Sequence, residues 1–219
     1  MENRGQTLRR STLVGLALSA VMALGGGCTN LLFTAAYLIK GNDAPAECTK
    51  LSDKRVAVVC RPVVALQYNN ARVDQDLASE ISSLLQKNVK KIKVIDHRKV
   101  AEWMDENTWD EYVEVGKALG ADMVVGVDLE FFDLRQSQTL YQGRANAQVK
   151  VVDCKTKEVV FKKRLPQTIY PPNRVVQASD MEEHQFRREF VHVLADQIGR
   201  SFYPHDRYAD FALDSKHVE

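Results

Sequence analysis

Gly116-Lys-Ala-Leu-Gly-Ala-Asp-Met-Val-Val-Gly126 is the stretch that decides the fold, because it joins a helical pattern to a strand pattern. Before it, Thr108 and Glu111 have the spacing of a capping box. That spacing predicts a helix that runs through Leu119 and ends at Gly120. After Gly120 the apolar residues recur at every second position, at Val125, Val127, Leu129 and Phe131. This alternation is typical of a long strand with one buried face.

Two strand–helix units precede this stretch. Arg55–Arg61 is a short, apolar, β-branched run, which is typical of a buried strand, and Lys93–Ile95 is a second strand. Between them, residues 71–89 predict an amphipathic helix, and Asp96 can cap the helix that follows the second strand. The apolar face of the helix over 71–89 comprises Val73, Leu77, Ile81, Leu84, Leu85 and Val89.

Further strands and a last helix follow it. Residues 139–153 and 158–168 predict two strands, and the short turns before and between them favour antiparallel pairing. Ser179 and Glu182 form another capping box, which predicts the start of the final helix. The apolar stripe of that helix holds Phe186, Phe190, Leu194 and Ile198.

The predicted order of elements is β-α-β-α-α-β-β-β-α. Two crossover units followed by an antiparallel meander imply an α/β (α+β) fold, in which helices pack on a mixed β-sheet. The chain has 219 residues, of which 45% are hydrophobic and 27% charged, the ordinary balance of a globular protein. We expect one α/β domain over residues 54–202 and a polar tail over 203–219.

The amino terminus has the pattern of an export signal. Residues 1–11 are polar and carry Arg9 and Arg10, and residues 12–24 are an apolar run too short to span a membrane. Three glycines then precede Cys28, which resembles the bacterial lipobox, although Gly25 stands where that pattern usually has Leu. We expect a signal peptide over 1–27 and a lipid on Cys28. An uncleaved anchor helix and a twin-arginine signal are the alternatives.

Residues 28–53 are expected to hold the lipidated Cys28, a membrane-proximal apolar segment and a linker. The apolar segment is Leu31–Ile39, which either rests at the membrane surface or packs on the domain. Residues 40–53 contain Gly and Pro and have no periodicity, so they predict the linker.

Charge and cysteine content narrow the classes of function. Removing residues 1–27, which hold three Arg and one Glu, changes the formal net charge from +1 to −1, and this argues against nucleic-acid binding. Besides Cys28 the chain has Cys48, Cys60 and Cys154. Their odd number leaves at least one thiol unpaired, and the sequence does not fix any pairing. Their spacing suits no zinc site, so we expect no metal and no cofactor.

The chain resembles a group of bacterial envelope domains. The group includes the amino-terminal domain of TolB, the curli-secretion channel lipoprotein and the lipoprotein activators of penicillin-binding proteins. The matching residues are Arg-Val-Ala-Val-Val at 55–59, Val-Ile-Asp-His-Arg at 94–98 and the stretch at 116–126, and the likeness covers roughly residues 54–202. The resemblance implies a non-enzymatic role, either binding envelope proteins or building an oligomer. The short turns leave no room for the transmembrane hairpins of the curli channel.

No catalytic motif stands out. Asp128 and Glu130 lie on one side of the long strand, but a solvated outer face is the preferred interpretation over paired-carboxylate catalysis. His184 and His192 are too far apart on their helix for a zinc motif. Trp103 and Trp109 are expected to pack in the core rather than to anchor an interface. Two basic clusters, Lys87, Lys90, Lys91 and Lys93 and then Lys162, Lys163 and Arg164, are interpreted as solvated rims rather than lipid or acidic-partner sites.

These patterns predict a non-enzymatic, lipid-anchored lipoprotein of the bacterial envelope. It would face the periplasm, with the outer membrane the expected location, and it would act on envelope proteins by protein–protein contact in envelope assembly. The alternatives are a subunit of an oligomeric secretion assembly, and then a hydrolase that acts on wall material. A homo-oligomer is compatible with the first two.

Overall fold

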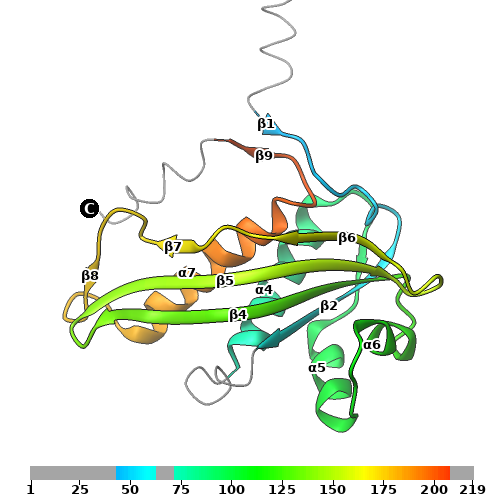
Figure 1. Ribbon diagram of the computed structural model, residues 1–219, viewed down its shortest axis with the longest axis horizontal. Coiled ribbons are helices and arrows are strands. Elements are labelled where there is room, and N and C mark those ends of the chain that lie inside the picture. Colours follow the sequence, from blue (N-terminus) through cyan, green and yellow to red (C-terminus); the bar gives the residue numbers. More distant parts are fainter. Residues whose placement is uncertain (1–42, 63–71, 208–219) are drawn as a thin grey trace, which may run out of the picture. The chain divides into compact units, whose positions relative to one another are not determined.

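The computed structural model describes residues 43–62 and 72–207 (Figure 1). The helices in this part of the chain are α4 (Val73–Asn88), α5 (His97–Glu106), α6 (Tyr112–Ala118) and α7 (Glu183–Gly199). The strands of the main sheet are β2 (Arg55–Pro62), β3 (Lys93–Val94), β4 (Met123–Ser137), β5 (Leu140–Asp153), β6 (Val159–Arg164), β7 (Thr168–Tyr170) and β8 (Val176–Gln177). The short strands β1 (Asp43–Ala44) and β9 (His205–Asp206) form a separate two-stranded sheet.

The main sheet is mixed, which confirms the predicted class. Its order is β3-β2-β4-β5-β6, and β7 and β8 pair with β5 beside β6. β2 runs parallel to both β3 and β4, whereas the pairs that β5 makes are antiparallel. The strand expected over 158–168 is divided into β6 and β7. Pro166, which lacks the N–H that a ladder needs, lies between the two.

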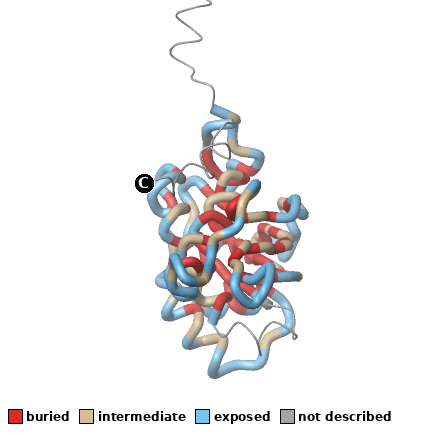
Figure 2. Tube along the Cα trace, turned by 90° about the vertical axis from the view of Figure 1, so that its left-hand side faces the viewer, coloured by how far each residue is buried: buried red, intermediate tan, exposed pale blue. Residues whose placement is uncertain are grey.

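Helices cover the two faces of the sheet unequally. The larger core cluster joins α4 and α7 to one face, through residues such as Val58 and Val149. The smaller cluster joins α5 and α6 to the other face, but only near β2, the start of β4 and the end of β5, through residues such as Ala57, Val124 and Val152. Figure 1 shows α4 and α7 behind the β4–β5 ribbons, and in Figure 2 the buried segments gather in the interior with exposed segments around them. The rest of the second face has no helix over it within the described residues.

Two glycines let aromatic rings lie flat against the strands. A Cβ built on Gly126 of β4 would stand 2.7 Å from a ring carbon of Tyr112 in α6. A Cβ on Gly143 of β5 would stand 2.5 Å from the ring of Phe190 in α7. Real Cβ atoms do not approach so closely, so each glycine sets how near its helix packs to the sheet.

Helix starts agree with the sequence in one case and differ in two. Asp96 caps α5 as predicted, because its Oδ1 accepts the Arg98 N–H at 2.9 Å. The capping box at Thr108 is wrong, since Glu111 precedes the first helical residue of α6 and no side chain caps it. Burial of Tyr112 against the sheet sets that start instead. The prediction of a capping box at Ser179 and Glu182 is also wrong.

The start of α7 shows why that second box fails. The hydroxyl of Ser179 pairs with Asp180 Oδ1 at 2.8 Å, and α7 begins only after Glu182, which makes no side-chain cap. A local contact between neighbouring side chains has replaced the reciprocal contact that the spacing suggested.

The described cysteines are free and buried. Cys48, Cys60 and Cys154 each lie in the core, where the pKa of each thiol is raised by burial. Cys48 and Leu51 precede β2 and belong to the larger cluster. No helix in the described ranges is both long and apolar enough to cross a membrane.

Candidate functional site

The uncovered side of β4, β5 and β6 is the largest feature that the fold leaves for recognition, and we call it the open face. β5 defines it, because its burial alternates strictly over most of its length. One set of side chains points into the core, and the other set is half-exposed on the opposite side. The half-exposed set is Leu140, Gln142, Arg144, Asn146, Gln148 and Lys150. Phe131 of β4 pairs with Asn146 and is 37% exposed on this surface. Its predicted place on the buried face is therefore wrong, because a register shift between Leu129 and Phe131 puts Phe132 in the core instead.

Asp128 is the centre of the open face where it meets α6. Its side chain is only 17% exposed and accepts hydrogen bonds from three side chains. These are the Tyr112 hydroxyl at 2.6 Å, Lys150 Nζ at 2.7 Å and Arg61 Nη2 at 3.1 Å. Burial alone would raise the pKa of Asp128, but the hydrogen bonds from Lys150, Tyr112 and Arg61 outweigh it and hold the pKa below its ordinary value. Asp128 is therefore an ionised anchor.

Two aromatic rings and a guanidinium group lie beside this anchor. The Arg61 guanidinium lies 4.9 Å from the ring centroid of Tyr112 and 5.6 Å from that of Trp109, and the two rings are 5.9 Å apart. Arg61 Nη1 also donates to the Asp110 carbonyl at 3.1 Å. Burial and the bond to Asp128 raise the pKa of Tyr112 far above its ordinary value, so its hydroxyl stays a donor. These contacts hold the start of α6 against the end of β2 and the middle of β4.

Cross-strand ion pairs continue along the open face. Glu130 of β4 accepts from Arg164 of β6 at 2.5 Å, and Asp133 lies 3.5 Å from Arg144 of β5. The interpretation of Asp128 as a solvated outer residue is therefore wrong, because Asp128 is mostly buried and fully paired. Asp128 and Glu130 each pair with a basic side chain, so these two carboxylates do not form the acid and base pair that catalysis would need.

The other residues that the sequence singled out, namely basic, histidine and tryptophan side chains, do not form a common site. Lys163 pairs with Glu47 on the side of β6 away from Arg164, so the second basic cluster is divided between two faces. Among the histidines, His192 joins α7 to Glu80 of α4 at 2.6 Å. Trp103 and Trp109 pack, partly buried, against the smaller core cluster, as predicted. The described residues contain no group of His, Cys, Asp and Glu able to hold a metal ion.

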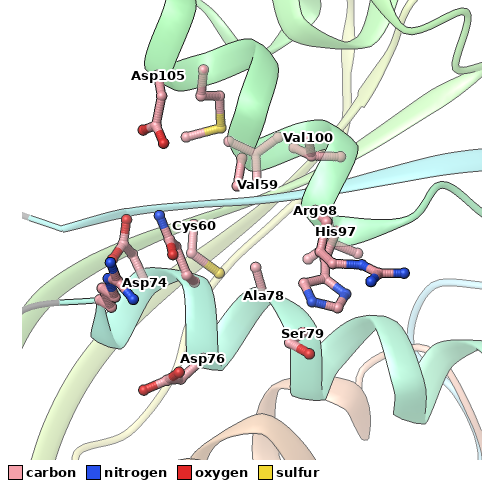
Figure 3. A pocket seen from close by; sticks show the side chains of 15 residues that line it. Val59, Cys60, Asp74, Asp76, Ala78, Ser79, His97, Arg98, Val100 and Asp105 are labelled. Carbon is pink, nitrogen blue, oxygen red and sulfur yellow. The ribbon is translucent and has the colours of Figure 1, made fainter.

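A cavity of about 270 Å³ lies between α4 and α5, beside the carboxyl end of β2. Figure 3 shows Asp74 and Asp105 at one end of it, His97 and Arg98 at the other, and Cys60 on the strand between. Burial raises the pKa of Cys60 well above its usual range, and Asp74 adds to the rise, so the thiol is protonated and unreactive at neutral pH. We call this cavity the α4–α5 cleft.

The sequence pattern predicts some of the residues of this site and leaves others unpredicted. The alternation places Asp128 and Glu130 on one face of the strand. It does not predict that Arg61, Tyr112 and Lys150 contact Asp128. The period of β4 indicates the face, whereas the partners depend on strand register and on where α6 begins. Cys28 and Leu31–Ile39 lie outside the described residues.

Comparisons with known proteins give only distant likenesses. No protein-family model matches the chain, and no curated protein matches it. The PelC dodecamer from Paraburkholderia phytofirmans is similar in structure, with 11% identity, a TM-score of 0.41, and coverage of 71% of this chain and 93% of that one. Lipoprotein GNA1162 from Neisseria meningitidis has 11% identity, a TM-score of 0.42 and coverage of 67% and 99%.

A third similar structure is the C-terminal domain of LpoB from Salmonella enterica, with 10% identity, a TM-score of 0.34, and coverage of 61% of this chain and 90% of that one. Each of these likenesses has a TM-score below 0.5 and an identity of 11% or less, so none of them places this chain in a family. Such distant likeness assigns no activity and no partner to this chain.

Proposed function

We propose that this chain is an exported lipoprotein, held at a bacterial membrane by a lipid on Cys28, that binds other envelope proteins through the open face. The open face is the observation that carries the binding role. It combines the exposed ring of Phe131 with paired charges and partly exposed polar side chains, the mixture found where a protein surface meets another protein. The signal-like residues 1–27 and the cysteine after three glycines support the anchor.

The paired charges suit recognition better than chemistry. Asp128, Glu130 and Asp133 are each neutralised by a basic side chain, so a partner can cover them without isolating a charge. The cross-strand pairs also hold the long side chains in place before a partner arrives, and this lowers the entropy lost on binding.

The anchor is tested with a Cys28→Ser variant and a lipoprotein signal-peptidase inhibitor. In the parent protein, we expect incorporation of labelled palmitate, a membrane-bound product and a larger precursor under the inhibitor. Cys28→Ser should lose the label and the membrane attachment. An unchanged mass under the inhibitor would exclude lipoprotein processing. Cys48→Ser is the matched control and should keep the label.

The binding face is tested by photo-crosslinking in intact cells. A benzoylphenylalanine replaces Phe131 on the open face, or Arg188, which is exposed on α7 at the opposite side of the sheet. We expect a discrete protein adduct from position 131 and none from position 188. Adducts of equal yield at both positions, or none at position 131, would remove the open face from the proposal.

The oligomeric alternative has one structural feature in its favour. β6 is an edge strand within the described sheet, and its Val159 side chain is 54% exposed. An exposed edge strand can pair with a copy of itself. Light scattering on the purified protein from residue 29 onward distinguishes the two hypotheses. A discrete large oligomer favours a subunit of a secretion assembly, and a monomer favours a tethered binding module.

A further inference from the structure

β2 extends far beyond its pairing with β3. The two strands pair only at Arg55 and Val56, and the Ile95 N–H then bonds to the Val56 carbonyl at 2.8 Å before the chain turns into α5. β2 continues to Pro62 and pairs with β4 along this whole length. One side of β2 is therefore a strand edge over its carboxyl-terminal part.

The direction of the free main-chain groups follows from strand geometry. In a parallel strand, alternate residues point their N–H and C=O groups toward the same neighbour. Lys54 and Val56 use their carbonyls on the β3 side, so the main-chain groups of Val58 and Cys60 point to that side as well. Within the described residues they meet no main-chain partner there. Unpaired edges of this kind accept an added strand.

The edge lies inside the α4–α5 cleft. Val58, Val59 and Cys60 form the cleft's inner wall, and α4 and α5 form its two sides. Small side chains, Ala78 and Ser79 of α4 and Ala101 of α5, line the cleft, so a peptide backbone can come close to β2. Figure 3 shows Ala78 and Ser79 beneath the strand and the helix that carries Val100 above it.

The charges in the cleft are unevenly distributed. Asp74 and Asp105 approach one end from α4 and α5, and neither makes an ion pair in the part of the chain that the structure describes. Asp76 nearby is already paired with Arg187 at 2.7 Å. The end where β3 stops carries His97 and Arg98. Arg72, which directly precedes α4, also lines the cleft, so the lining holds basic side chains besides the carboxylates. A strand that fills the cleft would therefore place a cation at the Asp74–Asp105 end.

We propose that the α4–α5 cleft binds an extended segment of a partner protein, which adds as a strand to β2 beyond β3 and places a Lys or Arg side chain between Asp74 and Asp105. Main-chain hydrogen bonds to Val58 and Cys60 supply affinity, and the two carboxylates select the basic residue. This cleft is distinct from the open face, and it depends neither on that face nor on the lipid at Cys28.

The test is a phage library of random short peptides, selected on the purified, detergent-solubilised full chain. The peptides recovered should share one Lys or Arg within an apolar, β-prone sequence.

Calorimetry then measures the affinity for such a peptide. Asp105→Asn should weaken its binding about tenfold, as expected for loss of a partly desolvated charge pair. Replacing the peptide's basic residue by Ala should weaken it by a similar factor, and the two changes together should cost little more than one. Glu102→Gln, an exposed acid on the same helix that does not line the cleft, is the matched control and should not change binding.

A second measurement separates strand addition from simple charge attraction. N-methylation of alternate peptide amides should abolish binding for one set of alternate positions and spare it for the other, because only one set faces β2. Equal effects of the two sets would overturn strand addition. Recovery of no peptide, or of peptides that bind Asp105→Asn and the parent equally, would overturn the proposal as a whole. Crosslinking at position 131 tests the open face separately, so the two proposals can fail independently.

Discussion

The Tyr112 hydroxyl donates to Asp128 Oδ1 at 2.6 Å, and this contact joins the first residue of α6 to the middle of β4. The same Tyr112 ring lies against Gly126, two residues earlier on that strand. One side chain thus supplies both the packing and the polar contact that position α6. The start of this helix is therefore determined by a tertiary contact.

Replacing Tyr112 by Phe should lower the free energy of unfolding by about 1–3 kcal/mol, because a hydrogen bond to a mostly buried charge is lost while the ring stays. Chemical denaturation at neutral pH measures it. Tyr141→Phe is the control, since its hydroxyl makes no hydrogen bond among the described residues, and it should change stability little. Equal losses in both variants would show that the bond to Asp128 contributes nothing specific.

Asp128 should make stability depend on pH in the acid range. Its pKa in the folded protein lies below the ordinary value, so its stabilising effect is complete above the unfolded pKa of about 4 and is lost as the pH falls through the folded pKa. Asp128→Asn should therefore be less stable than the parent by about 1–3 kcal/mol at pH 7. The difference should shrink below about pH 4. A difference that stays constant from pH 7 to the acid limit would contradict the lowered pKa.

The sequence predicts the layers of this fold better than its contacts. The period-two run after Gly120 and the apolar runs before it identify the strands, since burial on one or both faces leaves a direct trace in residue type. The residues at which helices begin are predicted less well from the sequence. Thr108 and Ser179 have the capping spacing, but burial of Tyr112 and a local bond to Asp180 override it. Local spacing can be outweighed by tertiary packing that it does not encode.

The candidate site shows the same limit. Asp128 can be placed on the outer side of its strand from alternation alone. Its partners Arg61 and Lys150 come from strands on either side, and the register that aligns them depends on hydrogen-bonding between the strands. The open end of β2 is also invisible in the sequence, because it exists only where β3 stops short.

Gly126 and Gly143 should tolerate no side chain. An added Cβ would meet the ring of Tyr112 or of Phe190, so each Gly→Ala change must displace an aromatic side chain and a helix. We expect each to destabilise by about 1–3 kcal/mol, the usual cost of overpacking. In the double variant Gly126→Ala with Tyr112→Ala the clash is removed, so the two losses should not add. Additive losses would place the cost in the strand backbone instead.

Asp74 and Asp76, in the first turn of α4, should respond to neutralisation with opposite signs. Burial chiefly raises the pKa of Asp74, and Asp105 and Asp76 raise it further, against bonds from the backbone that lower it. A carboxyl whose pKa is raised on folding opposes folding when ionised, so its cost is present at pH 7 and disappears once both states are protonated, below about pH 3. Asp74→Asn keeps an acceptor for the backbone and should raise the melting temperature at pH 7. The gain in the free energy of unfolding should be below about 1 kcal/mol, because the group is partly solvated.

Asp76→Asn removes the 2.7 Å pair with Arg187 and should lower the free energy of unfolding by up to about 1 kcal/mol. If both variants lose stability at pH 7, the Asp74 carboxylate is already stabilised within the folded chain. That result would contradict the proposal that Asp74 awaits a basic side chain of a partner.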